Sequence, residues 1–246
     1  MHINLLDLWA SMPLPVKAVV LVLTMQAIFC VAVVVDRMML LYQSRTRARE
    51  FAATVQPAME AAQYDQVLRA LETVKSSHLS DYLGFGLRTF IARAQAGDDA
   101  QRAAELTRRA LERKGDAISR ELNRGMNVLA STGSTAPFVG LLGTVLGILN
   151  AFKLVSVTGS GGIGAIGGAI SEALVVTGYG LVVAIPAVLV FNWLSARIAD
   201  YESGLINAGS ELLDRLETAT GAPAPTAGQS VGTGVAAPAR SATAWR

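Results

Sequence analysis

The sequence predicts an all-α integral membrane protein with three transmembrane helices and long helices that extend into a cytoplasmic helical domain. Of its 246 residues, 52% are hydrophobic and only 16% are charged, a balance typical of membrane proteins. The apolar residues gather in three long stretches, each able to cross a hydrocarbon layer of about 30 Å as a helix. A charged segment with helical periodicity separates the first stretch from the second.

The first apolar stretch predicts a transmembrane helix at residues 16–36, preceded by a short segment at residues 1–15. No lysine or arginine precedes the stretch, and it ends at Asp36 and Arg37 rather than at small residues. It is therefore expected to be an uncleaved span and not a signal peptide. The single cysteine, Cys30, lies in this span and is interpreted as a small buried hydrophobe.

Residues 37–127 are predicted to form a helical domain outside the membrane, because they carry many charges of both signs. Apolar residues recur there at helical spacing. They are Leu79, Tyr82, Leu83, Leu87, Phe90, Ile91, Leu106, Ala110, Leu111, Ile118 and Leu122. Gly97, Asp98 and Asp99 interrupt this pattern and predict a break between at least two helices.

Two further spans are predicted at residues 128–157 and 163–195, joined by a glycine-rich turn at residues 158–162. Each span contains one charged residue, Lys153 in the second and Glu172 in the third. Because the connection is so short, the two spans are expected to form a hairpin.

The third span is predicted to continue outside the membrane as an amphipathic helix at residues 196–218. Its apolar positions are Ile198, Leu205, Leu212, Leu213 and Leu216. Residues 219–246 are rich in Ala, Pro and Thr and have almost no large apolar side chains. Such a segment cannot bury enough surface to fold, so the tail is expected to be disordered.

Basic residues predict the orientation of the spans. They cluster after the first span, before the second and after the third, at Arg37, Arg45, Arg47, Arg49, Arg120, Arg124 and Arg197. The other side offers only Lys17 and Lys153. Since basic loops stay in the cytoplasm, the N-terminus and the hairpin turn are expected outside, and the C-terminus inside.

The sequence gives little support to an enzyme, a cofactor or a metal site. It has no glycine-rich phosphate loop ending in Lys-Ser or Lys-Thr, so ATP hydrolysis is not expected. His2 and His78 are isolated along the chain, and no histidine accompanies the serines of the spans. The net charge of +2 is too small to indicate nucleic-acid binding.

Glu172 is the least expected residue of the third span. A charged side chain at the centre of a membrane helix costs about 2.5–3.5 kcal/mol, and no basic residue is near it in the sequence. A carboxyl group that can be neutral or ionised within a membrane suits a proton-linked role. The alternative is a polar residue held by hydrogen bonds to a neighbouring helix.

Small residues and two threonines accompany Glu172. The residues predicted to serve helix packing are Gly140, Gly143, Gly147, Gly168, Gly180 and Pro186. Thr144 and Thr177 could form a polar lining together with Glu172, or bond only their own helix backbone. Gly180 and Ala184 are expected to offer a smooth wall along which another helix could slip.

Two blocks of the sequence resemble the ExbB/TolQ proteins, which are relatives of the MotA flagellar stator subunit. They are TAPFVGLLGTVLGILNAF at residues 135–152 and ISEALVVTGYGLVVAIPAVLVFN at residues 170–192. They lie in the last two spans, which make up about a quarter of the chain. Small or aliphatic residues are expected at the pair Gly178-Tyr179, and the chain departs from the family pattern there through the tyrosine.

The resemblance implies a proton-channel subunit of the bacterial inner membrane. Such subunits form a homopentamer around two helices of a single-span partner of the ExbD/TolR type, which contributes an intramembrane aspartate. The proton-motive force then drives mechanical work on the cell envelope, through a TonB-like or TolA-like protein or in gliding motility. By position in the matching motifs, Thr144 and Thr177 correspond to the pore-facing threonines, and Glu172 to the glutamate of the third helix.

Two other functions remain open. A non-conducting scaffold would use the hairpin only for assembly and should tolerate Glu172→Gln. A secondary transporter is less well supported, because three spans without an internal repeat lack the symmetry usual in transporters.

Overall fold

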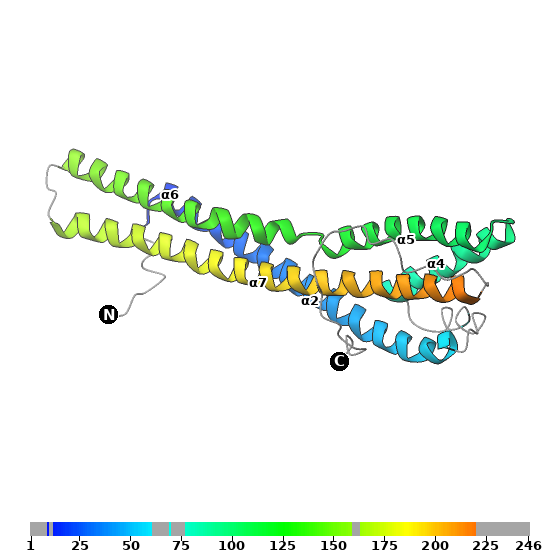
Figure 1. Cartoon of the computed structure of the whole chain (residues 1–246). Helices are drawn as coiled ribbons and strands as arrows, with labels where there is room; N and C mark the ends of the chain where they lie inside the picture. The colour runs from blue at the N-terminus through cyan, green and yellow to red at the C-terminus, as the bar shows by residue number, and fades with distance from the viewer. Residues whose placement is uncertain (1–8, 10–11, 61–68, 70–76, 159–162, 220–246) are drawn as a thin grey trace, which may run out of the picture. The chain divides into compact units, whose positions relative to one another are not determined.

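The computed structural model describes residues 9, 12–60, 69, 77–158 and 163–219, and this part of the chain is helical with no strand. The helices, drawn in Figure 1, are α2 (Leu14–Glu60), α4 (His78–Gln95), α5 (Ala100–Leu122), α6 (Met126–Thr158) and α7 (Ile163–Ala219). The predicted all-α class is therefore confirmed for the described residues. The predicted turn at 158–162 and the tail at 219–246 lie almost wholly outside them.

Helices α2, α6 and α7 are each long and apolar enough to cross a membrane. In their most apolar windows only 17% to 24% of the residues are buried within the chain. Most of this apolar surface is thus left for lipid or for other subunits. Helix α7 has 57 residues, or about 86 Å at 1.5 Å per residue, and it continues without interruption past Pro186.

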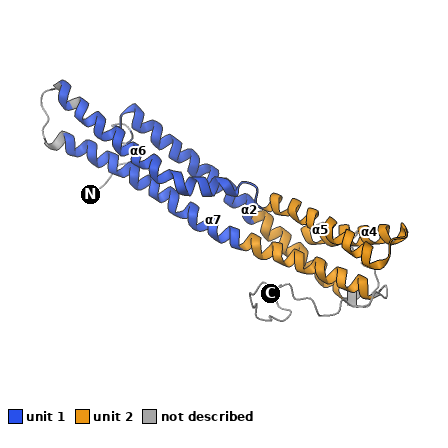
Figure 2. Ribbon diagram, turned by 45° about the horizontal axis from the view of Figure 1, so that its top comes forward, with its two compact units in different colours: residues 1–38, 123–196 blue, residues 39–122, 197–246 orange. Residues whose placement is uncertain are grey.

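The chain divides into two compact units, coloured separately in Figure 2. Unit 1 comprises residues 1–38 and 123–196, and unit 2 comprises residues 39–122 and 197–246. Helices α2 and α7 contribute residues to both units.

The core of unit 1 is formed by apolar side chains of α2, α6 and α7 together with Met12. Its buried members are Met12, Val16, Val19, Leu23, Ala136, Val176, Val183 and Ala184. These three helices therefore pack on one another within a single chain. Gly180 and Ala184, which were expected to offer a smooth wall to another helix, are both buried in this packing.

Unit 2 contains α4 and α5, whose ends are set by local hydrogen bonds. Ser77 caps α4 by accepting from the amide of Ser80 at 3.1 Å. Helix α4 ends before Gly97, whose φ of +91° is the left-handed conformation that favours glycine. The break predicted at residues 97–99 is confirmed.

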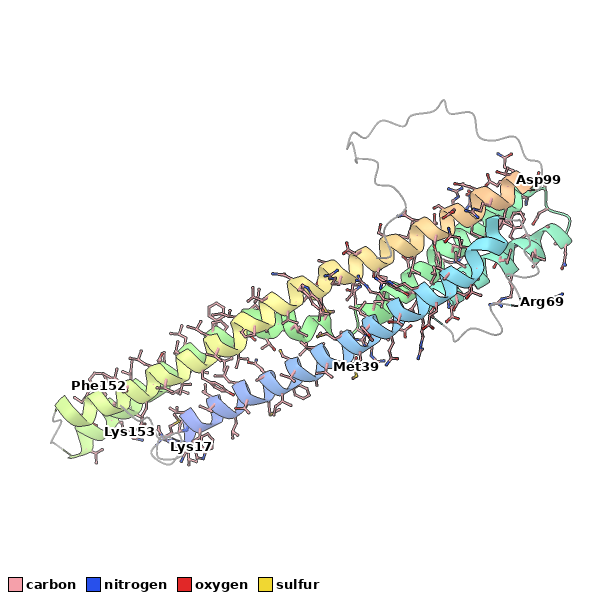
Figure 3. The ribbon with its side chains drawn as sticks, turned by 90° about the horizontal axis from the view of Figure 1, so that it is seen from below. Lys17, Met39, Arg69, Asp99, Phe152 and Lys153 are labelled. Atoms are coloured by element: carbon pink, nitrogen blue, oxygen red, sulfur yellow. The ribbon has the colours of Figure 1, made fainter. Side chains whose placement is uncertain are left out.

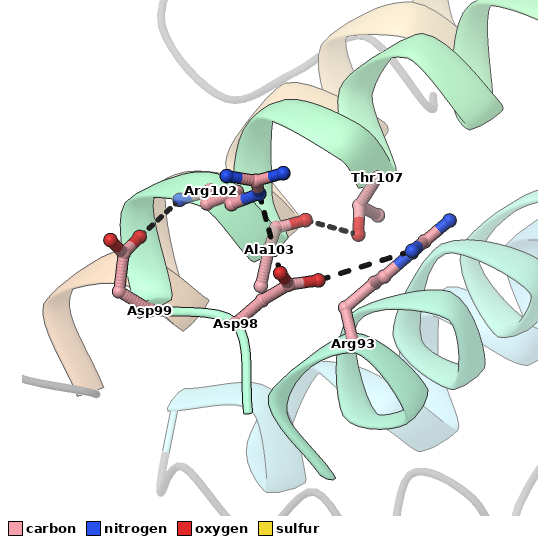
Figure 4. A network of polar contacts seen from close by, with 6 residues as sticks. All are labelled: Arg93, Asp98, Asp99, Arg102, Ala103 and Thr107. Atoms are coloured by element: carbon pink, nitrogen blue, oxygen red, sulfur yellow. Dashed lines mark hydrogen bonds and ion pairs between the residues drawn. The ribbon is translucent and has the colours of Figure 1, made fainter. Parts of the chain in front are cut away.

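The start of α5 is held by two aspartates, shown in Figure 4. The Asp99 side chain accepts a hydrogen bond from the amide of Arg102 at 2.7 Å, which satisfies one free N–H of the first turn. Asp98 lies 3.3 Å from the Arg102 guanidinium and 3.9 Å from that of Arg93. The acidic pair therefore ties the beginning of α5 to the end of α4.

The core of unit 2 follows the helical pattern found in the sequence. Buried residues of that pattern include Leu79, Tyr82, Leu87, Phe90, Leu111, Ile118, Leu122, Ile198, Leu205, Leu212, Leu213 and Leu216. Ala48, Phe51 and Val55 of α2 are buried as well, so the first long helix also contributes to this unit.

Candidate functional site

The contact between α6 and α7 is made backbone to backbone at two glycines. A Cβ atom added to Gly180 would lie 2.7 Å from the carbonyl oxygen of Ala136 and 3.2 Å from the Cα of Gly140. A Cβ at Gly140 would lie 3.1 Å from the Cα of Thr177. No larger side chain fits at this crossing unless the helices separate, which is the use of small residues in membrane helices.

The other predicted packing residues differ among themselves. A Cβ at Gly143 would lie 2.5 Å from Cγ1 of Val176, and one at Gly147 would lie 2.8 Å from Cβ of Ala173. Gly168 has nothing within 4 Å of such an atom, and Pro186 is exposed. Gly140, Gly143, Gly147 and Gly180 therefore line the hairpin contact, whereas Gly168 and Pro186 do not.

Thr177 links the two helices by a hydrogen bond. Its hydroxyl donates to the carbonyl oxygen of Gly140 on α6 at 2.9 Å. Thr144, with 9% of its surface exposed, instead donates to Leu141 of its own helix at 2.7 Å. Since Thr144 lies about one turn from Gly140, the structure brings both threonines to the same part of the hairpin contact.

Glu172 is half-buried on α7 but does not share a face with Thr177. Five residues separate them, which at 100° per residue places the two side chains about 140° apart around the helix. Ala173 and Val176, which lie between them in sequence, are buried. The predicted lining is therefore divided, with the threonines at the α6–α7 contact and Glu172 on a different face.

Two polar pairs join α2 to the hairpin, and the sequence alone did not predict either. The Tyr179 hydroxyl lies 3.2 Å from Oγ1 of Thr24. Thr24 already donates its only hydroxyl hydrogen to the carbonyl of Val20 at 2.8 Å, so Tyr179 is the donor. Gln26 likewise donates to Thr135 of α6 at 3.3 Å. The only signal for the first pair was the departure of Tyr179 from the family pattern.

His78, isolated along the chain, has close neighbours in unit 2. Its Nδ1 lies 3.0 Å from Oγ of Ser44, and its ring meets that of Tyr201 edge-on with centroids 6.1 Å apart. The carboxylate of Glu121 lies 3.7 Å from Nε2. Among the described residues no group of three or more His, Cys, Asp or Glu side chains could hold a metal ion. His78 therefore serves the packing of unit 2.

Three helices are long and apolar enough to span a membrane, and two of them form a glycine-lined hairpin with Thr144, Thr177 and the Glu172 carboxyl group. These features define a multi-pass helical membrane protein. Residues 77–205, just over half of the chain, match the model of the MotA/TolQ/ExbB proton channel family, and the chain belongs to this family.

Relatives with known names are similar to part of the chain. The chain is 50% identical over 92 residues to the biopolymer transport protein ExbB of Xanthomonas campestris pv. campestris strain B100, covering 37% of this chain and 36% of the relative. It is 44% identical over 103 residues to ExbB of Pseudomonas putida, covering 42% and 31%. It is 38% identical over 120 residues to ExbB of Salmonella typhimurium, covering 49% of each. The chain thus spans less than half the length of these relatives.

Proposed function

We propose that the chain is the proton-channel subunit of an inner-membrane complex of the ExbB/TolQ type. With a single-span partner of the ExbD/TolR type, it would convert the proton-motive force into mechanical work on the cell envelope. The observation that carries this proposal is the Thr177 hydroxyl, half-buried within a membrane-spanning hairpin and bonded to a backbone carbonyl of the facing helix. Family membership supports the same function.

The hydrogen-bond state of the threonines suits contact with an acid that gains and loses a proton. The hydroxyl hydrogens of Thr144 and Thr177 are donated to carbonyl oxygens, so each oxygen offers lone pairs as acceptors. A protonated partner carboxyl group could donate a hydrogen bond to these oxygens. A carboxylate can only accept, so it would first have to take the Thr177 hydroxyl hydrogen from the Gly140 carbonyl. The site therefore favours the protonated partner, which is the form that can cross an apolar layer.

The proposed assembly is a homopentamer around two partner helices. The apolar faces of α2, α6 and α7 that stay exposed within the chain would meet lipid and neighbouring subunits. The distribution of basic residues supports a periplasmic N-terminus and hairpin turn, with the C-terminus in the cytoplasm. Each charge that crosses would then release about 2.3 kcal/mol per 100 mV.

The relatives named biopolymer transport protein ExbB favour TonB-dependent outer-membrane transport over the Tol-Pal or gliding systems. A TonB-like protein is accordingly the proposed third component, in place of a TolA-like one.

A non-conducting scaffold is the second candidate, and two observations favour it. Thr144 bonds only its own helix, and Glu172 lies on a different face from Thr177. In a scaffold Thr177 would join the two helices of the hairpin, and Thr144 and Glu172 would have no role in conduction.

Replacement of the chromosomal copy distinguishes the two candidates. We expect Thr144→Ala, Thr177→Ala and Glu172→Gln to lose energy-dependent uptake across the outer membrane while the protein remains at wild-type levels in the membrane. Gly178→Ala is a matched control, because a Cβ at Gly178 meets nothing within 4 Å. Uptake at the wild-type level in all three variants would refute conduction through these residues and favour the scaffold.

A further inference from the structure

No basic residue is near Glu172 in the sequence. The hydrogen bond between Tyr179 and Thr24, however, aligns α7 with α2 so that a lysine of α2 lies opposite Glu172. These hydroxyls lie 3.2 Å apart on α7 and α2. Seven residues along a helix are about 10.5 Å and return to within about 20° of the same face. Glu172 precedes Tyr179 by seven residues, and Lys17 precedes Thr24 by seven. Because α2 and α7 run in the same direction (Figure 1), Lys17 and Glu172 occupy matching positions on the two helices.

The core of unit 1 supports this register at the level of Lys17. Val16 is 1% exposed and Val19 is 5% exposed, so α2 is still covered by its neighbours there. A Cβ on Gly143 would lie near both Val19, at 3.2 Å, and Val176, at 2.5 Å, which places α2 and α7 at the same level of α6. Lys17 and Glu172 are themselves half-buried.

We propose that Lys17 is the cation that balances the charge of Glu172 across the α2–α7 interface. The role of this pair in conduction rests on the proposed function, whereas the pairing of Lys17 with Glu172 does not. An ionised carboxylate is far less costly in a membrane when an opposite charge faces it. Glu172 then tunes the field beside the proton path as one half of a neutral pair. Loss of one partner leaves the other uncompensated, whereas loss of both restores neutrality.

The other nearby polar groups help to define the pair. Tyr179 lies on the same face of α7 as Glu172 but donates its hydrogen to Thr24. The ammonium group of Lys17 lies 5.9 Å from the ring centroid of Trp9, a contact that is compatible with a nearby carboxylate. Lys153 lies toward the same end of unit 1 as Lys17 (Figure 3).

Lys153 is a matched control for Lys17. The residues of α6 that face α7 include Gly147 and the buried Ala151. Lys153 follows Ala151 by two residues, about 200° around the helix, so its side chain leaves the opposite face. Lys153→Gln therefore removes the same charge at the same end without touching the proposed pair.

Zero-length carbodiimide cross-linking of the full chain in native membranes tests the pairing without any need for conduction. The reagent joins an amine to a carboxyl group with loss of water, and mass spectrometry should identify a Lys17–Glu172 peptide. The link should persist in Lys153→Gln and disappear in Lys17→Gln and Glu172→Gln. Absence of the Lys17–Glu172 link in the wild-type chain, while other lysines cross-link, would overturn the pairing.

Proton flux in liposomes, with the chain reconstituted beside its single-span partner, tests the role. We expect Lys17→Gln and Glu172→Gln each to lose flux roughly tenfold, and the double variant to return close to the wild type. Lys17→Arg, which keeps the charge, should conduct. A double variant as poor as Glu172→Gln would overturn the role of the pair. A wild-type complex without flux would refute the proposed function instead, and the cross-link alone would then decide whether Lys17 and Glu172 pair.

Discussion

Replacing Gly180 with alanine is expected to force α6 and α7 apart. The added Cβ would lie 2.7 Å from the Ala136 carbonyl oxygen, about 0.7 Å inside the ordinary contact limit of 3.4 Å. The atom it meets belongs to the backbone, so no side chain can turn aside to make room. Overpacking of this kind costs about 1–3 kcal/mol, and the bond from Thr177 to Gly140 crosses the same contact and should lengthen.

Gly178→Ala controls for the general effect of alanine in a helix. A Cβ there meets nothing within 4 Å, and alanine is favoured over glycine in a helix by about 0.5–1 kcal/mol. Thermal unfolding of the purified chain in detergent, followed by circular dichroism, compares the two variants. We expect Gly180→Ala to melt about 2–10 °C below the wild type and Gly178→Ala to melt at or above it. Equal melting temperatures for the two variants would refute the close approach.

Three further changes concern unit 2. Asp99→Ala should lower the free energy of unfolding by about 1 kcal/mol, because it removes the cap on the Arg102 amide. Asp99→Asn should keep most of that stabilisation, and chemical unfolding measures both variants. Gly209→Ala should destabilise the unit, because the new Cβ would lie 2.7 Å from the ring of Tyr82, and Tyr82→Leu in the same background should relieve the clash. Burial, and secondarily the Glu112 carboxylate, raises the pKa of Tyr82 above the ordinary value for tyrosine. The unfolded tyrosine therefore ionises first, so the contribution of Tyr82 to stability is fully present below the unfolded pKa and is lost as the pH rises through the folded one. Tyr82→Phe should remove that part of the alkaline slope in chemical unfolding.

Periodicity predicted the buried positions well because burial on one face of a helix repeats every three to four residues. Leu205 and Leu212 of α7 are buried as their spacing indicated. Gly97 likewise marked the end of α4, because the backbone after this helix takes a left-handed conformation that favours glycine.

The polar contacts between helices could not be predicted in the same way. Thr144 and Thr177 are alike in sequence, each in an apolar span beside a glycine, yet only Thr177 bonds the facing helix. The difference depends on how each helix is rotated against its neighbour, which no local pattern records. For the same reason the position of Lys17 opposite Glu172 follows from contacts between helices, namely Thr24 with Tyr179 and Val19 and Val176 at Gly143, and not from the sequence.

The most direct test of the proposed proton path is the proton flux of wild-type, Thr177→Ser and Thr177→Ala complexes in liposomes under an imposed pH gradient. Serine keeps the hydroxyl that bonds Gly140, and alanine removes it. Conduction by the wild type and the serine variant, with loss in the alanine variant, is the predicted result. Equal flux in all three, or a wild-type complex that holds the gradient, would contradict a proton path at the α6–α7 contact.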